Sequence, residues 1–299
     1  MRDWVYQDMK VAIYGNRRQE RFLHRLQDFF VTLKRRGLEA YVDSDFAAYL
    51  SECGVATPGA HSVDEFPDGV TVVISIGGDG TFLRAAQWTA DRETPILGIN
   101  TGHLGFLASY SLDEVDELAR VIVARIGVAE KRMLLKVSGE DMPEGMWPYV
   151  LNEVAVVKGD TMSMVDVKAY IDDYFVADYL ADGLVISTPT GSTAYNLSAG
   201  GPILEPTLHN MILQPIAPHS LTLRPLVIGA GSKVCLHISS RGAECHVGLD
   251  GRTFSLPGSG AKLMVERAPF CINVLRRQNT DFATILRKKL LWGKRESED

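Results

Sequence analysis

A glycine-rich turn that carries one carboxylate is the feature of this sequence with the clearest chemistry. Residues 77–81 read Gly-Gly-Asp-Gly-Thr and directly follow the apolar run Val70–Ile76. A turn between a strand and a helix directs backbone N–H groups and the helix dipole at its contents, which favours phosphate. Glycines let the backbone approach the anion because no Cβ intervenes. The turn therefore predicts a phosphate site; the alternative is a plain tight turn in which Asp79 caps the next helix.

Asp79 would lie beside that phosphate, where a purely structural carboxylate would repel the ligand. A carboxylate in this place is useful if it holds Mg²⁺ or takes a proton from an attacking hydroxyl. The sequence leaves both roles open.

A second polar loop follows the next predicted strand, Pro95–Ile99. It reads Asn-Thr-Gly-His-Leu-Gly-Phe over residues 100–106. In a parallel sheet, the loops at the carboxyl ends of the strands form the ligand crevice. We therefore expect the loops of Asp79 and Asn100 to face the same cleft, whereas His103 alone could equally be a surface residue.

The polar pair Asn152-Glu153 interrupts a predicted strand, Tyr149–Val157. Adjacent strand residues point to opposite faces, so a polar pair there is costly unless at least one side chain has a partner. A ribose diol or an amide would suit both, because the glutamate accepts from two hydroxyls and the asparagine both donates and accepts. The alternative is a strand end that faces water.

The densest polar stretch is residues 182–202, Asp-Gly-Leu-Val-Ile-Ser-Thr-Pro-Thr-Gly-Ser-Thr-Ala-Tyr-Asn-Leu-Ser-Ala-Gly-Gly-Pro. It combines a strand, a turn rich in hydroxyls and glycine, one helical turn and a second glycine turn. Many hydroxyls with few charges suit recognition of a neutral ligand that itself carries hydroxyls.

The elements that must position these residues fall into two patterns. Strands alternate with helices up to about residue 126, which predicts an α/β domain with a Rossmann-like parallel sheet. One of its helices opens with a capping box at Ser111 and Glu114. Residues 127–276 read as a β-rich domain of successive strands, and Leu221–Leu223 is one of the strands expected there. A last helix, Asp281–Trp292, and a polar tail make up residues 277–299, which we expect to pack back on the first domain.

Composition excludes several classes of protein. The 299 residues include 31 Lys and Arg against 37 Asp and Glu, a net charge of −6, which argues against a nucleic-acid binder or a polybasic membrane-surface protein. No apolar run approaches the ~20 residues of a membrane helix, and residues 1–8 lack the apolar core of a signal peptide. We expect a cytoplasmic protein with reduced cysteines. The Cys235/His237 and Cys245/His246 cluster matches no zinc spacing and reads as ordinary strand residues.

Taken in order, the segments at 77–81, 100–106, 152–153 and 182–202 resemble the NAD kinase family. The first segment alone is weak, since phosphofructokinases and diacylglycerol-type lipid kinases share it, whereas the fourth is highly specific. The resemblance implies an N-terminal α/β domain, a C-terminal β-rich NAD-binding domain, and transfer of the γ-phosphoryl group of ATP to the 2′-hydroxyl of the adenosine ribose of NAD. It also implies a divalent metal ion, Mg²⁺, that accompanies ATP without a fixed protein site, and a homodimer or homotetramer.

The resemblance also assigns roles to individual residues. Asp79 matches the catalytic base. The phosphate loop and its neighbour are Gly77, Gly78, Gly80, Thr81 and Arg84, and the NAD-binding positions are Asn152, Glu153, Asp182, Thr193, Ala194, Tyr195, Asn196, Leu197, Ser198 and Ala217. One departure is visible, because some members have a basic residue two positions before Asp182, where this chain has Leu180.

Two other functions compete with this interpretation. A lipid kinase would explain residues 77–81 only, and its membrane substrate would favour a basic or apolar docking face that the composition does not show. A non-catalytic dinucleotide-binding module would explain a pocket but not a carboxylate beside phosphate. The apolar residues of Val165–Ile171 beside those of Tyr174–Ala177 further predict a face covered by a second subunit.

Overall fold

The computed structural model describes residues 9–102, 105–159, 163–240, 244–258, 260–277 and 281–291. His103, Trp292 and the expected polar tail lie outside the described residues. The chain divides into two compact units: one runs up to Glu130 and resumes at Ile272, and the other is Lys131–Cys271. The divisions fall a few residues from the expected 126/127 and 276/277 because β7 (Val128–Ser138) and β18 (Ala261–Arg276) each continue from one unit into the other.

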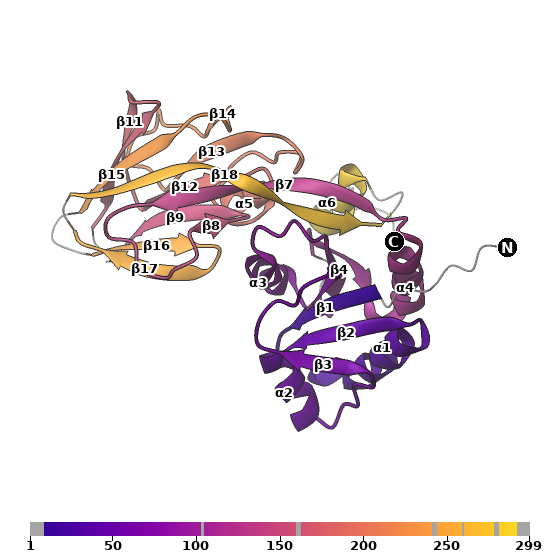
Figure 1. Cartoon of the computed structure of the whole chain (residues 1–299). Helices are drawn as coiled ribbons and strands as arrows, with labels where there is room; N and C mark the ends of the chain where they lie inside the picture. Colours follow the sequence, from indigo (N-terminus) through magenta and orange to yellow (C-terminus); the bar gives the residue numbers. More distant parts are fainter. Residues whose placement is uncertain are drawn as a thin grey trace. The chain divides into compact units, whose positions relative to one another are not determined.

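The five central strands of the first unit form a parallel sheet, and the direction in which the chain adds strands reverses between β1 and β4. Its strands lie in the order β3-β2-β1-β4-β5, and Figure 1 labels the first four of them. Their bounds are β1 Met9–Gly15, β2 Leu38–Asp43, β3 Ala60–Val63, β4 Val70–Ile76 and β5 Ile96–Asn100, and both β6 (Ala108–Ser111) and the end of β18 pair with β5. From β1 the chain moves outward to β2, and from β4 it moves outward the opposite way to β5. This reversal confirms the predicted Rossmann-like sheet and marks the crevice between the carboxyl ends of β1 and β4 as the expected ligand site.

Helices cover this sheet because its strands carry apolar residues on both faces, as in β4, where Val72, Val73 and Ile74 are all buried. The helices are α1 Leu23–Arg35, α2 Ser44–Glu52, α3 Asp79–Thr89, α4 Val115–Ala124 and α6 Phe282–Leu290, with 3₁₀ turns at Glu20–Phe22 and Leu112–Glu114. Val72, Ile74 and Ile76 join one core with the apolar residues of α1, α2 and α4. α3 follows β4 directly and contacts β1, β4 and β5. Each described helix is too short or too polar to cross a bilayer.

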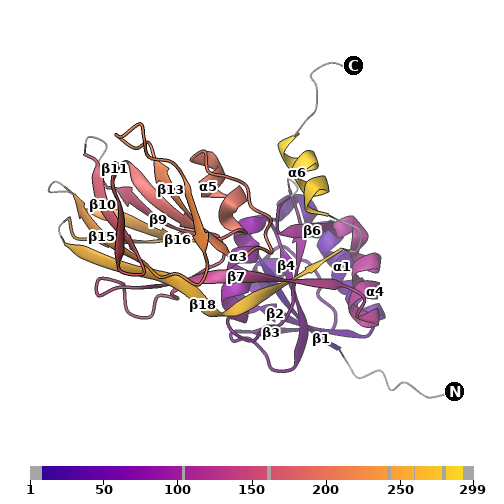
Figure 2. The ribbon, with the colours of Figure 1, turned by 90° about the horizontal axis from the view of Figure 1, so that it is seen from above.

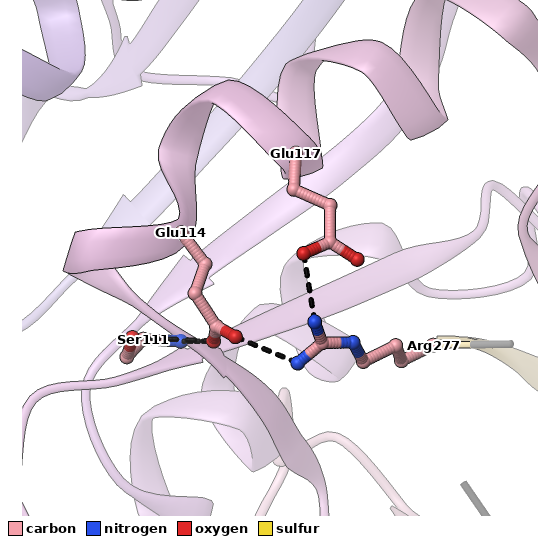
Figure 3. Close-up of polar contacts among 4 residues, drawn as sticks. All are labelled: Ser111, Glu114, Glu117 and Arg277. Carbon is pink, nitrogen blue, oxygen red and sulfur yellow. Dashed lines mark hydrogen bonds and ion pairs between the residues drawn. The ribbon is translucent and has the colours of Figure 1, made fainter. Parts of the chain in front are cut away.

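An arginine just after β18 attaches the returning chain to the first unit (Figure 3). The Arg277 guanidinium donates to Glu114 Oε1 at 2.6 Å and to Glu117 Oε2 at 2.7 Å. Glu114 also accepts from the backbone N–H of Ser111, so the predicted capping box is present. One guanidinium therefore joins the start of α4 to the end of β18.

The second unit is built from two antiparallel sheets that share one apolar core (Figure 2). One contains β11 (Tyr174–Ala181), β10 (Val165–Ile171), β15 (Val234–Ser240), β18, β7 and β8 (Tyr149–Val150). The other has the order β14 (Leu226–Gly229), β13 (Asn210–Ile216), β12 (Gly183–Ser187), β9 (Glu153–Lys158), β16 (Cys245–Leu249) and β17 (Arg252–Leu256). A 3₁₀ turn, Gly191–Thr193, and the short α5, Tyr195–Ser198, follow β12.

Val165, Val167 and Ala169 of β10 pack in the core of this unit, whereas Tyr174 and Phe175 of β11 are 78% and 57% exposed. A second subunit on the apolar residues outside that core therefore stays a prediction. Two other expectations for this unit were wrong. Leu221–Leu223 is a loop in which Leu221 is 86% exposed, and the strands nearby are β13 and β14. The predicted strand Tyr149–Val157 is broken at residues 151–152.

Candidate active site

The glycine turn lies at the reversal point of the first sheet and is fixed to the strand beside it. Gly77 has φ +151°, and a Cβ there would lie 2.9 Å from Asn16 Nδ2 and still closer to Thr81 Oγ1, which excludes larger residues. Asn16, directly after β1, donates from Nδ2 to Thr81 Oγ1 at 2.8 Å. Thr81 thus holds the turn in place, and Asn16 is a residue that sequence reasoning missed.

The Asp79 carboxylate is fixed by the loop that follows β5. Oδ2 accepts from the N–H of Phe106 at 2.9 Å and Oδ1 from the N–H of Leu107 at 3.1 Å. A Cβ at Gly105 would overlap Asp79 Oδ1, so this close approach requires glycine. The two loops assigned to one crevice are therefore in direct contact. The helix begins after Gly78 without a side-chain cap, so Asp79 does not serve as its N-cap.

A lysine from the last helix lies beside this carboxylate. Lys289 Nζ is 3.8 Å from Asp79 Oδ2 and 4.4 Å from the centre of the Phe106 ring. Burial lowers the pKa of Lys289, and the charge of Asp79 opposes that change. Sequence reasoning treated this helix only as amphipathic; the signal available was the basic pair Lys288-Lys289 in its last turn.

The rest of the turn is open to solvent. Gly78, Gly80 and Arg84 are exposed, whereas Gly77 and Thr81 are buried. An α-helix leaves its first N–H groups without intrahelical partners, and Arg84 lies one turn further along α3. The first unit therefore presents helix N–H groups and a fixed carboxylate at one place, with an exposed cation one helical turn away, an arrangement that suits phosphoryl chemistry.

In the second unit, the pair Asn152-Glu153 lies where β8 gives way to β9, and one carboxylate holds its backbone. Asp250 Oδ2 accepts from the N–H of Leu151 at 2.6 Å, and Asp250 Oδ1 accepts from the N–H groups of Asn152 and Glu153 at 3.0 Å each. Sequence reasoning did not single out Asp250 as a site residue, and the pair Asp250-Gly251 is itself typical of a hairpin turn.

Burial and the neighbouring Asp250 raise the pKa of Glu153 from 4.5 to about 8, although the N–H of Tyr195 acts in the opposite direction. Burial also raises the pKa of Asp250, but three N–H groups and Arg252 favour its ionised form. The pKa of about 8 leaves Glu153 largely protonated at neutral pH, and the three N–H groups and Arg252 are partners for an ionised Asp250. This corrects the expectation of a carboxylate that only accepts, because a neutral carboxyl donates one hydrogen bond as well. Its Oε2 is buried without a hydrogen-bond partner among the described residues.

The segment after β12 lies at the same end of the second sheet, since Ser187 pairs with Glu153. Tyr195 and Ser198 are exposed, and Thr193, Ala194 and Leu197 are half-buried. Asn196 is fully buried and donates to the carbonyls of Ser192 at 2.9 Å and Pro202 at 3.0 Å. Its Nδ2 thus closes the loop, whereas its Oδ1 is buried without a hydrogen-bond partner among the described residues.

Asp182 and Ala217 lie at the opposite end of β12, since the N–H of Asp182 donates to Ile216 O. Lys158 Nζ is 2.6 Å from Asp182 Oδ1, so a cation of β9 lies beside this aspartate. The structure therefore brings the predicted NAD residues together as two groups, separated by the length of β12, roughly 15 Å at about 3.3 Å per residue.

No three His, Cys, Asp or Glu side chains gather as a metal site within the described residues. A divalent ion that bridges phosphates requires only one or two protein carboxylates, so a single aspartate at a phosphate turn fits such an ion.

Taken together, the doubly wound sheet, its glycine turn and the fixed Asp79 define a nucleotide-dependent phosphotransferase. Comparison with known families gives a more specific result: residues 11–126 match the ATP-NAD kinase N-terminal domain and residues 151–276 match the ATP-NAD kinase C-terminal domain. The chain belongs to the ATP-NAD kinase family, and it is an enzyme that transfers phosphate to an alcohol group. This excludes the lipid kinase and the non-catalytic module, and the family's use of ATP implies a divalent metal ion.

Individual relatives cover nearly the whole chain. It is 39% identical over 293 residues to an NAD kinase of Porphyromonas gingivalis and 39% identical over 286 residues to one of Bacteroides fragilis, matches that cover 95% of this chain and 98% of each relative. Among solved structures, it resembles an Archaeoglobus fulgidus NAD kinase in complex with ATP, with TM-score 0.68 and 27% identity over 90% of this chain and 94% of that one. It shares the fold of yeast NADH kinase complexed with NADH, with TM-score 0.83 and 22% identity over 97% of this chain and 90% of that one.

Proposed function

We propose that the chain transfers the γ-phosphoryl group of ATP to the 2′-hydroxyl of the adenosine ribose of NAD, giving NADP and ADP, and that Asp79 accepts the hydroxyl proton. The observation that carries this assignment is the Asp79 carboxylate at the end of β4, with each oxygen oriented by one backbone N–H. A carboxylate oxygen has two lone pairs, so each oxygen keeps one for a substrate hydroxyl or a metal ion.

In this reaction the 2′-oxygen forms a bond to the γ-phosphorus while the bond to the bridging oxygen breaks, and ADP leaves with that electron pair. The proton of the hydroxyl passes to Asp79. Positioning and charge neutralisation provide most of the catalysis of phosphoryl transfer. The N–H groups at the start of α3 and the cations of Arg84 and Lys289 supply positive charge for that purpose.

The metal ion in this proposal is Mg²⁺, carried by the phosphates of ATP. Asp79 is the residue that would hold it, since Mg²⁺ in such sites takes one or two carboxylates and completes its shell with phosphates and water. Its chemistry would be to neutralise the charge on the transferred group.

The NAD contacts are proposed for both ends of β12. Asn152, Glu153, Tyr195 and Ser198 have side chains at one end, and Asp182 with Ala217 lies at the other. Asn196 belongs to the first group, through the Oδ1 that has no partner among the described residues. We also propose a homodimer or homotetramer and a cytoplasmic location, as the family resemblance implies.

The direct test is to incubate the protein with ATP, Mg²⁺ and NAD and to measure NADP. Asp79→Asn keeps the shape of the side chain but cannot take the proton, so kcat should fall by about 10²–10⁴-fold while NAD still binds. A variant that retains most of its kcat would remove Asp79 from the assigned role.

A further inference from the structure

Every backbone polar group of Leu151, Asn152 and Glu153 has a partner, although the first two lie outside the sheet. The three consecutive N–H groups all donate to the Asp250 carboxylate. On the acceptor side, Leu151 O receives the Thr188 hydroxyl at 2.6 Å, Asn152 O receives the N–H of Thr188 at 2.9 Å, and Glu153 O receives the N–H of Asp250 at 3.3 Å. The segment is therefore held from two sides, by Asp250 and by Thr188.

The hairpin between β16 and β17 places the carboxylate of Asp250. Asp250 has φ 49° and Gly251 has φ 83°, as in the two-residue turns that join twisted strands. The next residue, Arg252, donates to Trp147 O at 2.7 Å and to Tyr149 O at 2.8 Å. One short turn thus holds the chain before the polar pair through Arg252 and the pair itself through Asp250.

We infer that Asp250 is a positioning residue for substrate binding: it orients Asn152 and Glu153 by accepting hydrogen bonds from their backbone N–H groups. The inference rests on the proposed function in one respect, the assignment of Asn152 and Glu153 to NAD. A local turn residue would not need three N–H groups from a segment about a hundred positions away in sequence.

The substrate gives the neutral form of Glu153 a purpose. NAD carries two ionised phosphates, and an ionised glutamate in a buried pocket would repel them. Three backbone N–H groups donate to Asp250, and Arg252 lies near it, so these groups compensate its charge. Asp250 is also the neighbouring charged group that raises the pKa of Glu153. A neutral carboxyl donates to a ribose oxygen or an adenine ring nitrogen and accepts from another hydroxyl, which matches the unpartnered Oε2.

The positioning role is tested with Asp250→Asn. The substitution removes the charge and replaces one carboxylate oxygen, which accepts a backbone N–H, by an NH₂ group that cannot accept. We expect the KM for NAD to rise at least about tenfold while the KM for ATP stays within about twofold. Asp172→Asn is the matched control, because Asp172 also has φ 49° in a hairpin turn and accepts a backbone N–H, from Lys233 at 2.8 Å. It should change neither KM.

The donor role is tested with Glu153→Gln and Glu153→Ala, which also serve if Asp250→Asn does not fold. At pH 7 the glutamine variant should keep the KM for NAD within about threefold of the wild type, whereas the alanine variant should raise it about tenfold or more. Above pH 8 the wild-type KM should rise and that of the glutamine variant should stay flat. Equal damage by glutamine and alanine at pH 7 would overturn the donor role.

The wild-type assay separates this inference from the proposed function. If the wild type makes no NADP, the proposed function fails. If it does, and Asp250→Asn leaves both KM values as Asp172→Asn does, only the positioning role fails.

Discussion

Glu153→Gln is expected to make the protein more resistant to unfolding at pH 8, and the gain should disappear in acid. In the wild type, the pKa of Glu153 is about 8 when folded, against 4.5 for the ordinary group. Between these values the folded chain retains a proton that the unfolded chain releases, so stability falls as pH rises. Below pH 4.5 both states are protonated, and above pH 8 both have lost the proton, so the change is confined to this window.

The magnitude follows from the same two pKa values. At ~1.4 kcal/mol per tenfold change in proton affinity, the interval corresponds to at most ~5 kcal/mol. Glu153 keeps partial exposure, so solvent screening reduces the expected effect to ~2–3 kcal/mol. Glutamine cannot ionise, and its stability should not follow this slope.

The assay is thermal denaturation of both proteins at pH 5, 6.5 and 8. The midpoint difference, variant minus wild type, should increase with pH by several degrees, at ~2–4 °C per kcal/mol. Glu114→Gln is a control of opposite sign. Burial alone would raise the pKa of Glu114, but the N–H of Ser111 and the Arg277 guanidinium hold it below the ordinary value (Figure 3). Its variant should lose more stability at pH 8 than in acid. A midpoint difference for Glu153→Gln that is independent of pH would refute the reasoning.

Two further outcomes are expected. Lys289→Met should lower kcat by about ten- to hundredfold, or ~1.4–2.7 kcal/mol, because a cation 3.8 Å from Asp79 Oδ2 is lost. Lys289→Arg should recover part of the lost kcat, and an unchanged kcat in the methionine variant would count against a role for this lysine. Specific activity should fall on dilution if a second copy completes the pocket, and saturating NAD should restore it; light scattering that shows a fully active monomer at nanomolar concentration would rule this out.

The sequence predicted the parts of the fold in which local pattern and tertiary structure agree. The β-branched run Val70–Ile76 is strand β4 without adjustment, and the capping box at Ser111 begins a helical segment. Strand β13 was not predicted. It contains Pro215, which pairs with Leu184 of β12 but lies beyond the residues paired with β14, as expected for a residue without an N–H. Conversely, the alternating Leu221–Leu223 looked like a strand, although nothing pairs with it among the described residues.

The candidate site shows the same division. The turn at 77–81 and the pair Asn152-Glu153 have local signatures, and the sequence located them. Asp250 and Lys289 act through residues about a hundred and about two hundred positions away. No periodicity or spacing reports such contacts, because they depend on how the strands and helices pack. The turn at Asp250 was predicted correctly as a turn, but not the groups that its side chain would bind.

The division of the first unit between the two parts of the chain has a consequence for folding during synthesis. A ribosome releases Asp79 and the strands β1–β5 early, and then makes all of Lys131–Cys271 before the strand end at Val274 and the helix bearing Lys289 emerge. The second unit, in contrast, is contiguous and can fold as soon as it has been made. Until Val274 and Lys289 have been made, Ile96 of β5 lacks its strand partner and Asp79 lacks the neighbouring cation. The nascent protein should therefore complete its second unit before its first, so the surroundings of Asp79 are the last part of the molecule to form.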